Sequence, residues 1–186
     1  MSSLSARPDA VSEYGRTKLA LEQHFVRSGH TIIRPGTVLG SGGLFGKIAS
    51  MLEHFPVLPL LDGGHASMTV IGIRDLCRAF EAVLQSQQAT QYNFYYNDMP
   101  TLSDLLRLLA TTMKRKVLFI HVPSALLVMP LSILKCISIR TPVDVDNLKG
   151  YVTSLVPYYT TNLSAVLPRP STLQAALAEN WSDRHL

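Results

Sequence analysis

The spacing of apolar residues along the chain predicts helices that alternate with short strands. Apolar residues recur at helical spacing in several segments. Helices are expected over 11–26, over 47–54, from residue 75, from residue 102, after residue 123 and over 171–180. Runs of β-branched and aromatic residues predict strands at 31–34, 67–71, 92–96 and 117–122. This alternation indicates an α/β architecture with parallel strand pairing.

Local signals mark where the best-defined elements begin and end. Ser28 and Gly29 end the first helix, and Pro35 with Gly36 ends the strand that follows it. Thr101 is the expected N-cap of the helix from residue 102, because a threonine hydroxyl can accept a hydrogen bond from a free N–H of the first turn. No internal repeat or low-complexity tract is visible.

Composition and charge narrow the class of protein. The chain has 186 residues, of which 47% are hydrophobic and 16% charged, which predicts one folded domain rather than a disordered or fibrous chain. The net charge of +4 comes from bases scattered singly, apart from the run at 114–116. We interpret that run as a solvated helix end rather than a phosphate-binding patch, and we expect no nucleic-acid partner.

Cysteine usage and the N-terminus point to a reducing compartment. Cys77 and Cys136 both lie in apolar stretches, which predicts buried thiols instead of a disulfide framework, and two cysteines in such surroundings predict no zinc site. The first residues lack a charged segment followed by an apolar core. We therefore expect a cytoplasmic protein without a resident metal.

The apolar stretch at 117–139 raises the question of a membrane span. His121, Pro123, Pro130 and Lys135 interrupt the stretch, and two prolines at that spacing would break a single helix. We interpret it as a strand, a turn and a buried helix, and we do not expect membrane association. A membrane-attached protein stays open as an alternative, because bilayers select long apolar runs with few charges.

The sharpest chemical signal is the pair Tyr14 and Lys18. Residues four apart on a helix project from one face about 5 to 6 Å apart. A phenol near pKa 10 exchanges protons poorly at neutral pH, and a nearby ammonium stabilises the phenolate and lowers that pKa. Such a tyrosine can serve as an acid or base opposite a hydride carrier. About 0.2 such pairs are expected by chance in this composition, so an exposed lysine beside a half-buried tyrosine is the alternative.

The motifs around this pair resemble those of the extended short-chain dehydrogenase/reductase family, also called the NAD-dependent epimerase/dehydratase family. In that family a Ser-Ser segment ends a central strand, Tyr-x-x-x-Lys lies on the next helix, and Arg-Pro-Gly closes the following strand. The corresponding residues here are Ser2 and Ser3, then Tyr14 and Lys18, then 34–36. The likeness continues through 61–64, 70–76 and 101–105, so it covers nearly the whole chain.

The resemblance implies roles for particular residues. Tyr14 would be the general acid/base, and Lys18 would bind the ribose hydroxyls of NAD or NADP. Ser3 is the expected hydroxyl that binds the substrate oxygen, with Ser2 and Ser5 as alternatives because the register at the terminus is poorly fixed. The nicotinamide would lie along four consecutive residues that orient the ring, namely Pro35, Gly36, Thr37 and Val38.

One departure from the family concerns its nucleotide-binding half. The family begins with a strand and a glycine fingerprint that receives the pyrophosphate, and the chain starts where that half should end. We therefore expect a truncated Rossmann-type parallel sheet with a small α/β substrate-binding region. Residues 1–40 would carry the Rossmann-side elements with the Tyr-x-x-x-Lys helix. Residues 41–186 would form the substrate-binding region, with a returning Rossmann-side strand and helix near 67–97.

Several other features have weaker functional interpretations. Gly40, Gly43 and Gly46 are spaced like a phosphate-cradling turn, but they follow Arg-Pro-Gly, and we interpret them as a flexible loop leading to the substrate region. His65 is more readily incidental than a substrate contact. Three pairs or groups carry no expected catalytic role: Arg74 with Asp75 at a helix start, Tyr92, Tyr95 and Tyr96 as packing residues, and Arg140, Asp144 and Asp146 in a turn region.

The function expected from the resemblance is hydride transfer between NAD or NADP and a small molecule, with tyrosine as the acid/base. The substrate would be a sugar nucleotide or another carbonyl or hydroxyl compound, and reduction, epimerisation and dehydration are not distinguished. Two rivals stay open: a non-catalytic binding or assembly module derived from the family, and an enzyme whose missing half comes from another chain. The oligomeric state stays open, a homodimer included, because many relatives of the family pair through helices that include the Tyr-x-x-x-Lys helix.

Overall fold

The computed structural model describes residues 1–86, 90–123 and 158–181. The described helices are α1 (Glu13–Arg27), α2 (Gly43–His54), α3 (Ile73–Ser86), α4 (Leu102–Thr112), α7 (Leu163–Val166) and α8 (Leu173–Trp181), with a 3-10 turn at Asp62–Gly64. The described strands are β1 (Ile32–Pro35), β2 (Thr37–Leu39), β3 (Val57–Leu61), β4 (Val70–Gly72), β5 (Gln91–Phe94) and β6 (Leu118–Val122). The helix expected after residue 123 lies outside the described residues.

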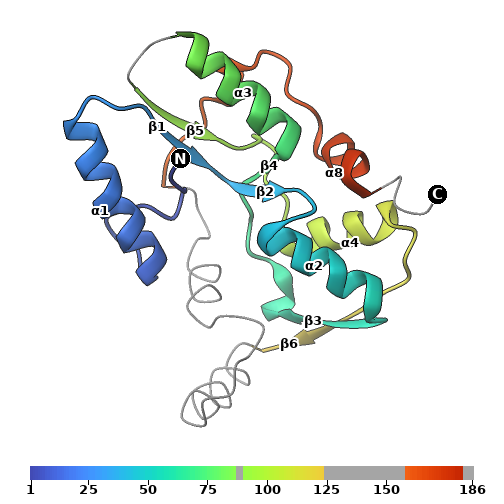
Figure 1. Cartoon of the computed structure of the whole chain (residues 1–186). Helices are drawn as coiled ribbons and strands as arrows, with labels where there is room; N and C mark the ends of the chain where they lie inside the picture. The colour runs from blue at the N-terminus through green and yellow to red at the C-terminus, as the bar shows by residue number, and fades with distance from the viewer. Residues whose placement is uncertain (87–89, 124–157, 182–186) are drawn as a thin grey trace.

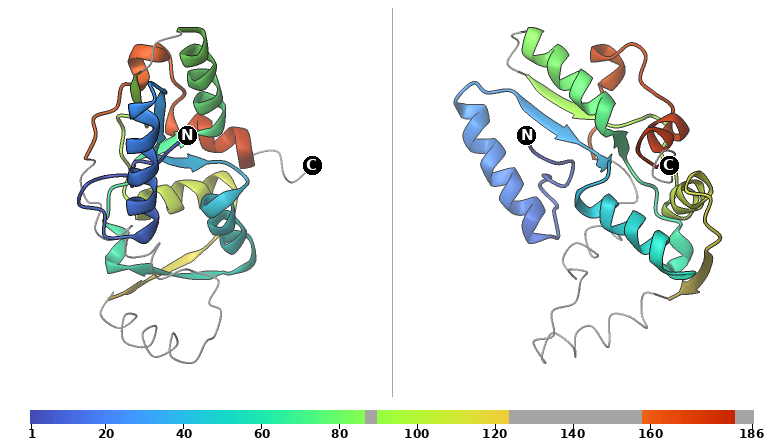
Figure 2. Two further views of the ribbon diagram at one scale, coloured as in Figure 1. Left: turned by 60° about the vertical axis from the view of Figure 1, so that its left-hand side comes forward. Right: turned by 45° about the vertical axis from the view of Figure 1, so that its right-hand side comes forward.

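The described strands form three parallel pairs, β1 with β5, β2 with β4 and β3 with β6. Parallel pairing requires a crossover between partners, and helices α2, α3 and α4 supply most of the crossovers (Figure 1). Helix α1 lies on one side of the β1–β5 pair and α3 on the other, as two further views show (Figure 2). The α/β architecture with parallel strands is thereby confirmed.

One buried apolar cluster joins the elements. Phe45 of α2 packs edge-to-face on Trp181 of α8, with ring centroids 5.4 Å apart. The largest fully buried side chains come from both ends of the chain, namely Trp181, Phe45, Phe94, Leu39, Leu52, Leu60, Ile71, Leu105, Leu109, Leu163, Leu177 and Val70. Side chains from the first 50 residues and from residue 158 onward therefore pack in the same core.

Several local expectations agree with the structure. Thr101 caps α4 as expected, by accepting the Asp104 N–H at 3.1 Å. Ser12 caps α1 by accepting the Gly15 N–H at 3.1 Å, a cap that was not predicted, and α1 begins at Glu13 instead of residue 11. Gly29 follows α1 in the left-handed region at φ 73°, where glycine has no steric penalty. Strand β3 was not predicted, because Pro56 and Pro59 are residues that rarely occur in strands. Its pairing with β6 at the outer edge tolerates them.

Three expectations were wrong in detail. Helix α2 begins at Gly43, four residues before the expected helix, so the glycine loop is shorter than predicted. Residues 37–39 form strand β2 rather than loop. Cys77 is exposed on α3, because the apolar positions of that helix face away from it; Cys136 lies outside the described residues.

Candidate functional site

Helix α1 carries the expected acid/base pair on a single face. Lys18 Nζ lies 5.7 Å from the centroid of the Tyr14 ring. The Tyr14 side chain is 48% exposed and Lys18 is half-buried. The four-residue spacing therefore does bring the ammonium beside the phenol, and the ring remains open to an incoming molecule.

The turn that carries the serines lies directly under the start of α1. A Cβ placed on Gly15 would come within 2.4 Å of the Ser5 carbonyl oxygen and 2.8 Å of the Ala10 Cβ. Only glycine allows the helix backbone to approach the turn this closely. Tyr14 and the serine turn are thus held next to each other by the residue that follows Tyr14.

Residues 2–4 run beside β1 as a further parallel segment. The Ser2 N–H donates to the Ile33 carbonyl at 2.7 Å, and the Leu4 N–H donates to the Pro35 carbonyl at 3.4 Å. Ser3 is half-buried, and its Oγ accepts the Ser5 N–H at 3.2 Å. Ser2 Oγ is buried and has no hydrogen-bond partner among the described residues. Both hydroxyls therefore stay candidates for a substrate contact, with Ser5 exposed at the bend.

The residues expected along the nicotinamide lie where the chain changes strand partner. Pro35 ends β1 beside β5, and the Gly36 N–H donates to the Phe94 carbonyl at 2.9 Å. The Thr37 N–H then donates to the Thr69 carbonyl at 2.7 Å, and Thr37 and Val38 pair with β4. A Cβ on Gly36 would lie 2.6 Å from Thr69 O. These backbone N–H groups hold the sheet together, while Gly36, Thr37 and Val38 remain half-buried.

Arg34 and Glu22 form a buried ion pair near this site that the sequence analysis did not predict. The Arg34 guanidinium donates to both Glu22 carboxylate oxygens, with Nε 2.8 Å from Oε1 and 3.0 Å from Oε2. Their side chains are 6% and 4% exposed. The signal that could have found Glu22 is an acidic residue one turn beyond Lys18 on the buried side of the helix.

A second buried network surrounds Asp75. The Tyr96 hydroxyl donates to Asp75 Oδ2, and the same carboxylate accepts the Ser171 N–H at 2.6 Å. Tyr92, Tyr95 and Tyr96 are all buried, which confirms their packing role. Asp75 lies in the first turn of α3, as expected of a helix-start carboxylate. It is also 1% exposed and ties α3 to residues far along the chain.

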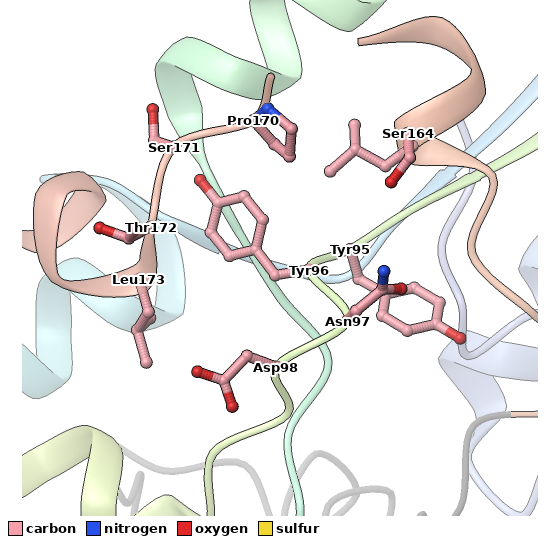
Figure 3. A pocket seen from close by; sticks show the side chains of 10 residues that line it. Tyr95, Tyr96, Asn97, Asp98, Ser164, Pro170, Ser171, Thr172 and Leu173 are labelled. Carbon is pink, nitrogen blue, oxygen red and sulfur yellow. The ribbon is translucent and has the colours of Figure 1, made fainter. Parts of the chain in front are cut away.

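A pocket of about 220 Å³ adjoins this network (Figure 3). The Tyr96 ring points toward Pro170 and Ser171, while Tyr95 points the other way. The lining includes none of Tyr14, Lys18 or residues 35–38. The expected site residues therefore lie on an open face of the described structure and not in this pocket.

The structure gives no further support for a functional role of the other residues that the sequence analysis considered. Gly46 lies in the first turn of α2, where a Cβ would be 2.3 Å from the Ser41 carbonyl oxygen, so packing explains this glycine. His65 is exposed, with its ring against the Gly63 backbone. The run Lys114, Arg115 and Lys116 is exposed after the end of α4, which agrees with a solvated helix end. Arg140, Asp144 and Asp146 lie outside the described residues.

Two findings bear on metals and membranes. Within the described ranges, no group of three or more His, Cys, Asp or Glu side chains could hold a metal ion. In the same ranges, no helix is both long and apolar enough to cross a bilayer.

Comparisons with known proteins agree on the architecture. No protein-family model matches the chain, and no curated protein matches it. The chain does match solved structures. A nucleoside-diphosphate-sugar epimerase from Staphylococcus aureus is 13% identical and matches with a TM-score of 0.68 over 95% of this chain and 62% of its own. The chain therefore shares the α/β fold of part of this structure, which confirms at the level of the fold the resemblance seen in the motifs.

Two further matches carry the same fold. A UDP-glucuronic acid 4-epimerase from Bacillus cereus in complex with NAD is 18% identical, with a TM-score of 0.64 over 97% of this chain and 58% of its own. A dTDP-glucose 4,6-dehydratase from Bacillus anthracis in complex with NAD is 15% identical, with a TM-score of 0.64 over 99% and 60%. The chain thus spans about 60% of the length of these three structures.

Proposed function

We propose that this chain carries the acid/base half of an NAD- or NADP-dependent oxidoreductase, epimerase or dehydratase. The observation that carries the proposal is the position of Lys18 Nζ 5.7 Å from the Tyr14 ring centroid, on an exposed face beside the serine turn. That arrangement equips Tyr14 to move a proton to or from a substrate oxygen.

The other residues would bind and orient. Lys18 would also donate to the ribose hydroxyls of the coenzyme, because an ammonium offers three donors. Ser3, or alternatively Ser2 or Ser5, would donate to the same substrate oxygen as Tyr14. Residues 35–38 would form the wall against which the nicotinamide ring lies. The coenzyme, when bound, supplies or accepts the hydride.

The donor set fits the nicotinamide end of such a coenzyme. Lys18 is half-buried with its ammonium over the Tyr14 ring, and Tyr14 is 48% exposed. The substrate would be a small molecule with a carbonyl or hydroxyl group, and a sugar nucleotide is the best-supported class because the matching epimerases and dehydratase act on sugar nucleotides by name.

The nucleotide-binding half would be part of the same polypeptide or of a second chain. The exposed edge beside residues 2–4 and the exposed face of α1 are the surfaces where it would be placed. In either arrangement the complete enzyme contains the residues described here. The expected domain division at residue 40 stays a prediction within this proposal.

Hydride transfer by the complete enzyme, with this chain's residues varied one at a time, tests the proposal. Tyr14→Phe removes the transferable proton and should lower kcat by about 10² to 10⁴. Tyr158→Phe is the matched control, since Tyr158 is also an exposed tyrosine, and it should leave kcat unchanged. Full activity of Tyr14→Phe would remove Tyr14 from the mechanism.

A non-catalytic binding or assembly module is the second candidate. It is favoured by the apolar side chains that α1 and the segment before it leave exposed, namely Val11, Leu21, Phe25 and Val26. Exposed apolar residues on one helix are typical of association surfaces. Stable association with a nucleotide-binding half, without hydride transfer to any carbonyl or hydroxyl substrate, would support this candidate over the enzyme.

A further inference from the structure

Helix α1 contacts the sheet through a charge and not through an apolar stripe. The buried residues of α1 are Gly15 and Glu22. The Glu22 carboxylate receives the Arg34 Nε at 2.8 Å and the Arg34 Nη2 at 2.5 Å. Apolar helix faces can slide or rotate at small cost, whereas a planar guanidinium fork accepts a carboxylate in one geometry. The attachment of α1 is therefore directional.

The position of Glu22 on the helix makes that direction matter for Tyr14 and Lys18. Glu22 lies one turn beyond Lys18 and two turns beyond Tyr14, so it sits about 6 Å and about 12 Å further along the helix axis. A helix fixed at Glu22 and at Gly15 has its rotation and its height above β1 both determined. These two quantities decide where the phenol and the ammonium point.

Arg34 is itself held from other sides. Its Nη1 donates to Asn93 Oδ1 at 3.3 Å and its Nη2 donates to Gln91 Oε1 at 2.9 Å, both on the neighbouring strand β5. The ring of Tyr159 lies over the guanidinium, with the carbon 4.2 Å from the ring centroid. A guanidinium stacked on an aromatic ring and bonded at its edges is restricted to one plane.

Tyr159 extends the same assembly to the serine turn. Its hydroxyl donates to the Ala6 carbonyl at 2.6 Å, immediately after Ser5. Its own carbonyl accepts the Tyr95 hydroxyl at 2.7 Å. The helix with Tyr14 and the turn with the serines are thus both connected to Arg34. The helix contacts Arg34 through Glu22, and the turn contacts it through Tyr159.

We propose that Arg34 is the positioning residue of the site: its guanidinium, clamped between Glu22 and the Tyr159 ring, sets how Tyr14 and Lys18 stand relative to the serine turn. This inference rests on the proposed function for its catalytic consequence, but the geometric part concerns the fold alone. Buried ion pairs are weak sources of stability and are better attested as devices that fix register. The arrangement fits that use.

Hydrogen exchange of the intact chain tests the geometric part without any coenzyme. Arg34→Lys keeps the charge and loses the planar fork, and it should speed exchange of α1 amides about tenfold or more while leaving α3 within about twofold. Tyr159→Phe keeps the stacked ring and loses the bond to Ala6, so it should loosen residues 5–10 more than α1. Arg74→Lys is the matched control, because the Arg74–Glu179 pair lies on the exposed side of α3.

Kinetics of the complete enzyme test the catalytic part. Arg34→Lys should lower kcat about tenfold or more with the coenzyme KM within about twofold, because the binding groups remain and only their alignment changes. Equal acceleration of exchange in α1 and α3 would overturn the proposal, as general loss of stability predicts that pattern. Unchanged exchange and unchanged kcat in Arg34→Lys would overturn it too. If even the unaltered enzyme transfers no hydride, the proposed function fails, and the exchange pattern still decides whether Arg34 positions α1.

Discussion

The hydroxyl of Tyr96 donates a hydrogen bond to Asp75 Oδ2 at 2.9 Å and accepts the Gly72 N–H at 3.0 Å. Asp75 also accepts the Ser171 N–H, and the exposed Arg78 donates to it at 3.2 Å. This pair therefore joins β4, the segment after β5, the start of α3 and the approach to α8. Together with the buried Leu177 and Trp181, it holds the C-terminal residues on the core.

Substitution of Asp75 should be among the most damaging changes in the described chain. Asp75→Ala leaves the Tyr96 hydroxyl and the Ser171 N–H buried without their acceptor, which should lower the free energy of unfolding by about 3 to 5 kcal/mol. Tyr96→Phe removes one donor and should cost about 1 to 3 kcal/mol. Urea unfolding measures both. A cost below that of the surface control Asp9→Ala would contradict the role given to Asp75.

Alkaline pH should weaken the fold through its buried phenols. Burial raises the pKa of Tyr95, Tyr96 and Tyr159 above the ordinary value of 10.0. Above about pH 10 the unfolded chain loses these protons while the folded chain keeps them, so stability is full below that pH and falls as the pH rises further.

The dependence on Tyr96 can be isolated. The midpoint of urea unfolding, followed from about pH 9 to about pH 11, should fall less steeply in Tyr96→Phe than in the unaltered chain. Leu84→Ala, a change at an exposed side chain that does not titrate, should keep the original slope. Identical slopes in all three proteins would show that Tyr96 ionises as readily in the folded state as in the unfolded chain.

Gly15→Ala should destabilise the chain although alanine favours helices by about 1 kcal/mol. The added Cβ would lie 2.4 Å from the Ser5 carbonyl oxygen, which is backbone and cannot turn aside. We expect a net loss of about 1 to 3 kcal/mol and a displaced serine turn. Gly42→Ala is the control, because nothing lies within 4 Å of a Cβ there. A gain in stability for Gly15→Ala would mean that α1 does not rest on the turn.

Periodic and local signals in the sequence predicted much of this fold. The helix after Thr101 begins where a hydroxyl can cap it, and parallel pairing follows from the alternation of elements. Strand β3 was missed because propensity describes average strands, whereas β3 has only β6 as its described partner and tolerates prolines.

The candidate site was predictable to a different extent. Tyr14 and Lys18 are related by helical spacing, so the sequence alone could place them together. The contact of Arg34 with Tyr159 depends on how segments 125 residues apart fold together, and no periodic pattern encodes it. Arg34 was noticed as part of a motif, and its ion pair with Glu22 became visible only in three dimensions.

Titration with coenzyme addresses what this chain binds by itself. The loop after β2 departs from the Gly-x-Gly-x-x-Gly spacing of a dinucleotide fingerprint, because residue 45 is Phe. Gly46, the third glycine of the loop after β2, is explained by its approach to Ser41. The N–H groups of Gly36 and Thr37 already donate to carbonyls of the sheet. We therefore expect no heat of binding for NAD(H) or NADP(H) below about 1 mM in isothermal titration of the 186-residue chain.

The control in this titration is the same chain together with a nucleotide-binding half, which should bind in the micromolar range if the proposed function holds. In that assembly Lys18→Met should weaken coenzyme binding about tenfold or more, because the ammonium and its donors are lost. Arg16→Met, an exposed change on the same helix, should not. Micromolar binding by the 186-residue chain alone would contradict the prediction and return attention to the loop at 40–46, where Gly42→Ala and Gly43→Ala would then be the variants to titrate.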